Sequence, residues 1–204
     1  GRVRCAGASA VKVLVTGASG RIGRAICVRL ARSHEVIGLD ASPSSTAHWV
    51  GDIGDELLLG QALRGIDAVV HVAALHAPHV ARSSEADFQR VNVNATRRLA
   101  ELAARSGVER FVFTSTTALY GDAATPAVRA GWVTEDTAPR PRTVYHGSKL
   151  AAEAALREVS AASAMAVTIL RMSRCFPEAV DIMAGYRLHR GIDAREKTHR
   201  RAHR

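Results

Sequence analysis

Long apolar runs are missing from this 204-residue sequence, and none approaches the ~20 residues that a membrane-spanning helix needs. The first ten residues also lack the apolar stretch of a secretory signal, so we expect residues 1–10 to be a short leader. We therefore expect no membrane among the partners of this chain.

Cysteine is scarce as well. The three cysteines, Cys5, Cys27 and Cys175, are far apart and lack the spacing of metal ligands. This excludes a disulfide framework and predicts a reduced, cytoplasmic setting with no metal site. Cys27 is expected to be a packed thiol inside a helix.

Acidic residues are outnumbered, which gives a net charge of +9. Between Arg187 and Arg204 stand seven basic and two acidic residues, so this stretch supplies +5 of the total. A basic run at one end of a chain is usually solvated, and the remaining sequence is only mildly basic. We therefore expect no nucleic-acid partner.

Three glycines, in contrast, lie close together in one stretch of the sequence, at positions 17, 20 and 23. Residues 16–23 read Thr-Gly-Ala-Ser-Gly-Arg-Ile-Gly, after an apolar run at 11–15 and before helical apolar spacing that reaches Leu30. Glycines let the backbone turn tightly, and a helix start offers N–H groups and a positive dipole end to an anion. The pattern predicts a pyrophosphate site; a turn with only a packing role is the alternative.

Asp40 ends the next apolar run, at 35–39, and lies ~20 residues beyond the glycines, where a ribose-binding carboxylate is expected. A carboxylate accepts hydrogen bonds from two hydroxyls and repels a 2′-phosphate, which favours NAD over NADP. Arg21, inside the glycine loop, argues against this preference, because its side chain could bind a phosphate. The alternative is that Asp40 is only a turn residue.

Apolar runs alternate with helical spacing along the chain. We expect further strands at 49–50, 68–74, 111–113 and 167–170, and helices at 57–63, 91–105 and 145–160. This alternation predicts an α/β fold with a doubly wound parallel sheet, a Rossmann fold, whose ligand crevice lies at the strand ends. His71, inside the run at 68–74, is expected to be a hydrogen-bonded core residue rather than a metal ligand.

Tyr145 and Lys149 are four residues apart, which places them on one face of the expected helix. A neighbouring ammonium and an oxidised cofactor would favour the phenolate, making Tyr145 a general base. A hydroxyl from Thr116 or Ser115 at the preceding strand end could bind the same substrate oxygen. The predicted chemistry is proton removal from an alcohol while hydride leaves for a cofactor. The alternative is a surface helix with an exposed lysine.

The chain resembles the NAD-dependent epimerase/dehydratase family of extended short-chain dehydrogenases/reductases, to which UDP-glucose 4-epimerase belongs. The similarity covers about residues 11–177. Its motifs are residues 16–23, Gly-Asp-Ile at 51–53, His-Val-Ala-Ala at 71–74, Asn-Val-Asn-Ala-Thr at 92–96, residues 113–121 and Tyr-x-x-x-Lys at 145–149.

The resemblance implies a role for each matched residue. The glycine loop would bind the pyrophosphate, Asp40 the adenosine ribose, Asp52 and Ile53 the adenine, and Ala73 and Ala74 the nicotinamide half. Asn92 matches a structural asparagine, Thr116 the active-site hydroxyl, Tyr145 the acid/base, and Lys149 would also bind the nicotinamide ribose. The predicted cofactor-binding set is Gly17, Ser19, Gly20, Arg21, Ile22, Gly23, Asp40, Asp52, Ile53, Ala73, Ala74, Asn92 and Lys149.

The chain also departs from the family. Arg174 stands where an asparagine is usual, and residues 181–204 resemble only the start of a substrate lobe before a basic tail. We therefore expect an NAD-binding domain at 11–180 and a truncated or frame-shifted family member with most of the substrate lobe missing. The coding DNA tests this expectation.

The leading hypothesis is an NAD-dependent oxidoreductase or epimerase acting on a nucleotide sugar or related hydroxyl substrate. A dehydratase is the weaker subtype because it needs a further acid, and a simple dehydrogenase stays open. The alternative is a non-catalytic NAD(P)-binding module, such as a redox sensor or scaffold. The resemblance also implies a homodimer through the helices near 91–105 and 145–160.

Overall fold

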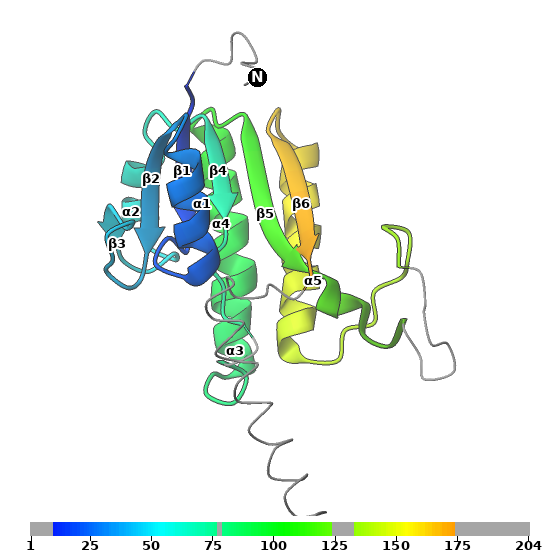
Figure 1. Ribbon diagram of the computed structural model, residues 1–204. Helices are drawn as coiled ribbons and strands as arrows, with labels where there is room; N and C mark the ends of the chain where they lie inside the picture. The colour runs from blue at the N-terminus through cyan, green and yellow to red at the C-terminus, as the bar shows by residue number, and fades with distance from the viewer. Residues whose placement is uncertain (1–9, 77–78, 124–132, 174–204) are drawn as a thin grey trace, which may run out of the picture. The chain divides into compact units, whose positions relative to one another are not determined.

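Parallel strands in the order β3-β2-β1-β4-β5-β6 form one sheet in this computed structural model, which describes residues 10–76, 79–123 and 133–173 (Figure 1). The strands are β1 (Lys12–Thr16), β2 (Glu35–Asp40), β3 (Trp49–Val50), β4 (Ala68–His71), β5 (Arg110–Thr116) and β6 (Ala166–Met172). The order reverses between β1 and β4, the switch point where such sheets bind ligands. The predicted doubly wound α/β fold is confirmed.

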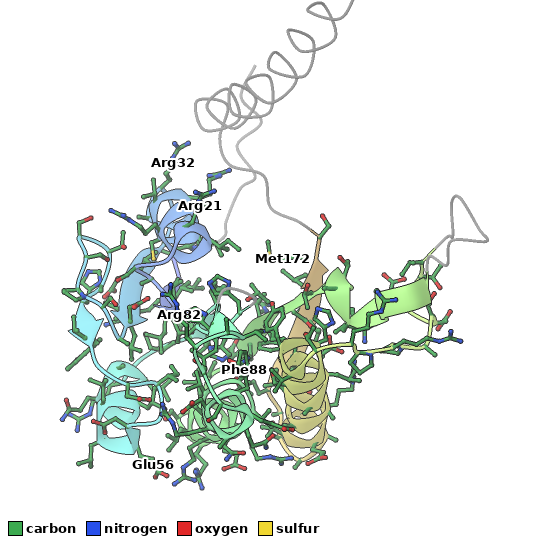
Figure 2. The ribbon with its side chains drawn as sticks, turned by 90° about the horizontal axis from the view of Figure 1, so that it is seen from below. Arg21, Arg32, Glu56, Arg82, Phe88 and Met172 are labelled. Carbon is green, nitrogen blue, oxygen red and sulfur yellow. The ribbon has the colours of Figure 1, made fainter. Side chains whose placement is uncertain are left out.

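Helices cover both faces of the sheet. Helix α1 (Arg21–Leu30) lies on one face, and α2 (Glu56–Ala62), α4 (Ala95–Arg105) and α5 (Val144–Ala161) lie on the other. Figure 2 shows these layers from the carboxyl ends of the strands, with Arg21 and Glu56 on opposite sides. Because side chains alternate along a strand, Val13 packs toward α1 while Leu14 joins the larger core under α4 and α5. The thiol of Cys27 is buried on the α1 face, as predicted.

Strand β4 ends at buried His71, three residues earlier than the apolar run predicted, and the residues after it contact Thr16. The Oγ1 of Thr16 accepts the N–H groups of Val72 and Ala73 at 3.2 and 3.3 Å, which turns this segment toward β1. The Thr16 hydroxyl is then left to donate to Nδ1 of His71 at 2.6 Å. His71 is consequently protonated on Nε2, which donates to Oγ1 of Thr96 at 2.8 Å. The prediction of a hydrogen-bonded core histidine is confirmed.

The helix expected at 91–105 has a more complex start. It is preceded by α3 (Glu85–Phe88), whose N-terminus is closed by a capping box between Ser84 and Asp87, and by a π-helical turn, η2 (Gln89–Asn94). The π turn widens the helix where Asn92 points toward α5, and such turns are frequent at functional sites. A 3₁₀ segment, η3 (Thr117–Ala123), follows β5.

Three predictions concern parts of the chain outside the described residues: most of the leader at 1–10, Arg174, and the region 181–204. Within the described residues, no helix is long and apolar enough to cross a membrane. No cluster of potential metal ligands was found in the same part of the chain.

Gly38 in β2 gives a stability test. A Cβ at this position would lie 1.8 Å from the carbonyl oxygen of Thr46, whereas one at Gly60 in α2 would meet nothing within 4 Å. We expect Gly38→Ala to lower the free energy of unfolding by about 1–3 kcal/mol through overpacking. Gly60→Ala should raise it by about 0.5–1 kcal/mol because alanine favours a helix. Urea unfolding of both variants checks this; shifts of the same sign would contradict the packing assignment.

His71 predicts how stability depends on pH. Burial, and secondarily the charge of Lys149, lower the pKa of His71 from 6.5 to about 3. Between these pH values the unfolded chain binds one proton more than the folded chain. This contribution to stability is therefore complete above the unfolded pKa and is lost as the pH falls toward 3, at about 1.4 kcal/mol per pH unit.

Urea unfolding at several pH values between 6.5 and 4.5 measures how steeply the free energy of unfolding changes with pH. In this range His71 is protonated in the unfolded chain but not in the folded chain. His71→Gln should reduce the slope by one proton relative to the unsubstituted chain, whereas His76→Gln, in an exposed loop, should retain most of it. An unchanged slope in His71→Gln would contradict a neutral buried imidazole.

Candidate active site

The glycine loop connects β1 to α1 and is built from close backbone contacts. Gly17 has φ +72°, and a Cβ there would lie 2.7 Å from the amide nitrogen of Ala73. A Cβ on Gly23 would lie 2.0 Å from the carbonyl oxygen of Gly17. Both glycines are thus required for packing. Helix α1 nevertheless begins at Gly20 without a side-chain cap, which leaves a helix N-terminus suited to an anionic ligand.

Asp40 lies at the end of β2, beside this loop. Its Oδ2 accepts the N–H of Ser19 at 2.9 Å, and its Oδ1 accepts the N–H of Ser42 at 2.8 Å. The hydroxyl of Ser19 donates to the carbonyl of Ser42 at 2.5 Å, and that of Thr46 to the carbonyl of Ala18 at 2.7 Å. The carboxylate of Asp40 therefore orients the loop. It also lies at the strand end where an acid that binds ribose hydroxyls is expected.

Asp52 and Ile53 follow β3. Oδ1 of Asp52 accepts the N–H of Gly54 at 2.7 Å, and Oδ2 pairs with Arg90 of η2 at 3.0 Å. These contacts, the hydrogen bond from Gly54 first, hold the pKa of Asp52 below its usual range despite some burial. Ile53 is buried in the larger core. The arrangement fixes the turn expected to contact the adenine.

Asn92 connects the end of β4 to the start of α5. Its Oδ1 accepts the N–H of Leu75 at 2.8 Å, and its Nδ2 donates to the carbonyl of Leu75 and to Oγ of Ser148. Ser148 in turn donates to the carbonyl of Tyr145 at 2.8 Å. A nearly fully buried asparagine thus fixes the segment that includes Ala73 and Ala74 relative to the first turn of α5.

Thr116, Tyr145 and Lys149 meet where β5 ends and α5 begins. The Thr116 hydroxyl lies close enough to Tyr145 to lower the pKa of its phenol, and Oγ1 of Thr116 accepts the N–H of Ala118 at 3.1 Å. Lys149 is 2 % exposed, and its Nζ lies 3.9 Å from the centroid of the Phe113 ring. The neighbouring Ser115 points elsewhere, donating to Glu153 at 2.6 Å. The structure therefore places Thr116 beside Tyr145, with Lys149 one helical turn further along α5.

Burial dominates the electrostatics of Tyr145 and Lys149 in the protein alone. Burial raises the pKa of its phenol, and the hydrogen bond to Thr116 opposes this shift without reversing it. Burial also lowers the pKa of Lys149 to about 7, against the opposing charge of Glu153. Lys149 is not among the causes that act on the pKa of Tyr145 in the protein alone, so the expectation that the ammonium and an oxidised cofactor together favour the phenolate stays a prediction. Tyr145 does lie in the first turn of α5, where the helix dipole favours an anion.

The sequence reasoning missed Glu153, which is fully buried on α5 and paired with Arg171 of β6. The signal was available: Glu153 follows Lys149 by four residues and Tyr145 by eight, so all three share one helix face. Its pairing with Arg171, in contrast, could not be predicted from neighbouring residues, because Arg171 lies on a distant strand. The role of Thr16 and Thr96 as partners of His71 was also missed.

Comparisons with known proteins give the chain its family. Residues 13–181 match the NAD dependent epimerase/dehydratase family. UDP-glucose 4-epimerase from Azospirillum brasilense is 31 % identical over 175 residues, covering 80 % of this chain and 49 % of that protein. L-arabinose 1-dehydrogenase (NAD(P)(+)) from Haloferax volcanii is 33 % identical over 159 residues, covering 70 % of this chain and 59 % of that protein.

A solved structure agrees with these matches. MoeE5 in complex with UDP-glucose and NAD superimposes with a TM-score of 0.69 and 36 % identity, over 78 % of this chain and 53 % of MoeE5. The chain spans about half the length of the curated relatives it matches. The family is NAD-dependent by its description, in agreement with the cofactor predicted from Asp40. By its sequence and its fold, this chain belongs to the NAD-dependent epimerase/dehydratase family.

Proposed function

We propose that this chain carries the cofactor-binding and proton-transferring part of an NAD-dependent oxidoreductase or epimerase for a nucleotide sugar or a related hydroxyl substrate. One observation carries the proposal: the Thr116 hydroxyl acts on the phenol of Tyr145, and buried Lys149 lies one helical turn away. Thr116 ends β5, the neighbour of β4 in the sheet, and the other two residues belong to α5. Residues 11–180 would form the NAD-binding domain.

The cradle at the glycine loop suits NAD. Gly17, Gly20 and Gly23, with Ser19, Arg21 and Ile22 between them, would hold the pyrophosphate at the uncapped start of α1. Asp40 would bind the adenosine ribose and disfavour the 2′-phosphate of NADP. Asp52 and Ile53 would contact the adenine, Ala73 and Ala74 the nicotinamide half, and Lys149 the nicotinamide ribose. Bound there, NAD would supply the hydride acceptor.

The proton chemistry belongs to the chain itself. Tyr145 would take the proton from the substrate hydroxyl, and Thr116 would hold the same oxygen through its own hydroxyl. The N-terminal turn of α5 stabilises the phenolate that this step requires. Among the described residues, the side-chain oxygen of Thr116 meets Tyr145 and the amide of Ala118. The absence of a carboxylate from these contacts supports an epimerase or dehydrogenase over a dehydratase.

Two observations favour a second candidate. The chain spans about half the length of its curated relatives, and the burial that raises the pKa of Tyr145 favours its neutral form; a module that binds NAD(P) without turnover, as a redox sensor or scaffold, is therefore the second candidate. Homodimerisation through α4 and α5 stays a prediction under either function.

Tyr145→Phe separates the candidates. We expect NAD to bind more tightly than NADP in calorimetric titrations, and the purified chain to interconvert UDP-glucose and UDP-galactose or to reduce NAD with a sugar substrate. Tyr145→Phe should lower turnover by about 10²–10⁴-fold, the usual contribution of a general base, with NAD affinity unchanged. His146→Gln, the adjacent residue, is the matched control and should retain activity.

NAD binding without turnover in the unsubstituted chain would favour the sensor or scaffold. Failure to bind either dinucleotide would refute the cofactor assignment, and full activity in Tyr145→Phe would refute the proton-transfer role.

A further inference from the structure

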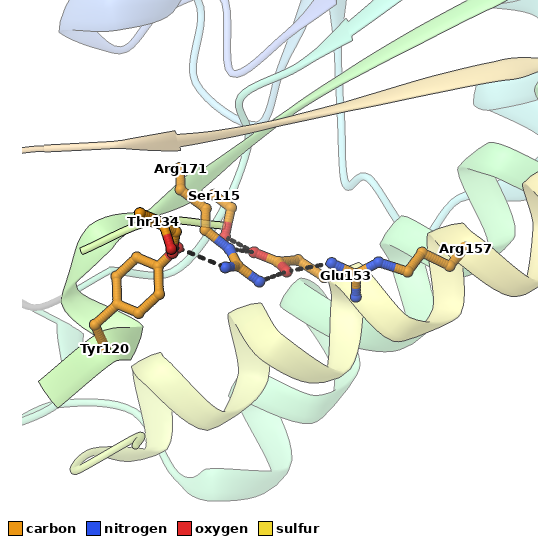
Figure 3. A network of polar contacts seen from close by, with 6 residues as sticks. All are labelled: Ser115, Tyr120, Thr134, Glu153, Arg157 and Arg171. Carbon is orange, nitrogen blue, oxygen red and sulfur yellow. Dashed lines mark hydrogen bonds and ion pairs between the residues drawn. The ribbon is translucent and has the colours of Figure 1, made fainter. Parts of the chain in front are cut away.

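Glu153 is the centre of a buried polar network beside the candidate active site (Figure 3). Its Oε1 accepts Oγ of Ser115 at 2.6 Å and Nε of Arg171 at 3.0 Å. Its Oε2 accepts Nη2 of Arg171 at 2.7 Å and Nη2 of Arg157 at 2.9 Å. The side chain is 0 % exposed, so these three residues take the place of water around the carboxylate.

The network keeps this carboxylate charged. Burial alone would raise the pKa of Glu153, but hydrogen bonds from Arg171, Ser115 and Arg157 outweigh it and leave the pKa below its usual range. The contact with Arg171 is bidentate, the geometry in which guanidinium and carboxylate bind best. The same contact raises the pKa of Arg171 further. Glu153 is therefore a fixed negative charge inside the protein.

The elements that the network joins are those that carry the catalytic candidates. Ser115 immediately precedes Thr116 on β5, and Glu153 shares α5 with Tyr145 and Lys149. Nη1 of Arg171, on β6, donates to the Tyr120 hydroxyl of η3 at 2.7 Å, and that hydroxyl donates to the carbonyl of Thr134 at 3.1 Å. The carboxylate thus fixes the end of β5 against the catalytic face of α5.

Lys149 experiences this charge directly because residues four apart on a helix are neighbours. The other titratable groups near its ammonium are uncharged: His71 of β4 is held neutral by burial, and burial favours the neutral form of Tyr145 on α5. From β5, Lys149 meets the aromatic face of Phe113. Glu153 is the group whose charge opposes the desolvation of Lys149.

We propose that Glu153 is a positioning residue for the function proposed above: its carboxylate aligns Thr116 with Tyr145 and supplies the counter-charge that favours the ammonium form of Lys149. Arg157, whose side chain is 55 % exposed, moderates this charge from the surface end of the network. Arg171 neutralises the buried end. The ionisation of Lys149 is thereby set by residues that do not themselves contact the reacting atoms.

The lysine content makes the proposal directly measurable. The chain has three lysines, Lys12, Lys149 and Lys197, so ¹³Cε-lysine labelling gives three signals, and Lys12→Arg and Lys197→Arg assign two of them. We expect the pKa of Lys149 to be near 7 in the cofactor-free chain. Glu153→Gln should lower the pKa of Lys149 by about one pH unit or more, because a negative charge one helical turn away is removed. Glu158→Gln, an exposed glutamate on the same helix, is the matched control and should leave it unchanged.

Arg157→Gln provides a change of opposite sign at the surface. Removing this cation leaves Glu153 less neutralised, so the pKa of Lys149 should rise. Equal values in Glu153→Gln and Glu158→Gln would overturn the proposal, as would a constant or lowered value in Arg157→Gln. If Glu153→Gln does not fold, the Arg157→Gln titration decides. Because these titrations use neither NAD nor substrate, their outcome is independent of the turnover experiment.

Discussion

The backbone contact between Gly17 and Ala73 is the constraint on which the candidate site depends. It brings the turn after β1 against the segment after β4, at the point where the strand order reverses. Thr16 secures the contact by accepting hydrogen bonds from two N–H groups of that segment and donating a hydrogen bond from its hydroxyl to His71. A side chain on Gly17 would separate the two turns, and the glycine loop would then no longer adjoin the residues expected under the nicotinamide.

Desolvation is the second constraint, and it acts on charge rather than on shape. Burial removes Lys149, His71 and Glu153 from water, and the three side chains differ in how the loss of hydration affects their charge. His71 gives up its charge, Glu153 keeps its charge through two arginines, and Lys149 is balanced between the two states near neutral pH. Burying an ion costs stability unless partners compensate it. Lys149, whose charge is incompletely compensated, lies one helical turn from Tyr145. A change of its charge would therefore act on the proposed proton transfer.

Local patterns were sufficient to predict the architecture but not the contacts between distant elements. The apolar runs located the strands and the glycine spacing located the first turn, because both signals are contained within a few residues. The end of β4 was misplaced because it is decided by Thr16, which lies on another strand. The π turn at 89–94 escaped prediction because helical periodicity does not reveal its wider turn. The burial that raises the pKa of Tyr145 could not be predicted from nearby residues, because it depends on the whole fold.

The same distinction separates what the site can determine from what it leaves to other residues. In the proposed function, Thr116, Tyr145 and Lys149 would act on a single hydroxyl group, and the loop at residues 17–23 would bind a dinucleotide. Such an arrangement would suit alcohols of different structure. This agrees with the matches of the chain to both a UDP-glucose 4-epimerase and an L-arabinose 1-dehydrogenase. Under the proposed function, substrate choice would therefore come from residues that surround the remainder of the substrate, while the fold described here would position the cofactor and the residues of the proton step.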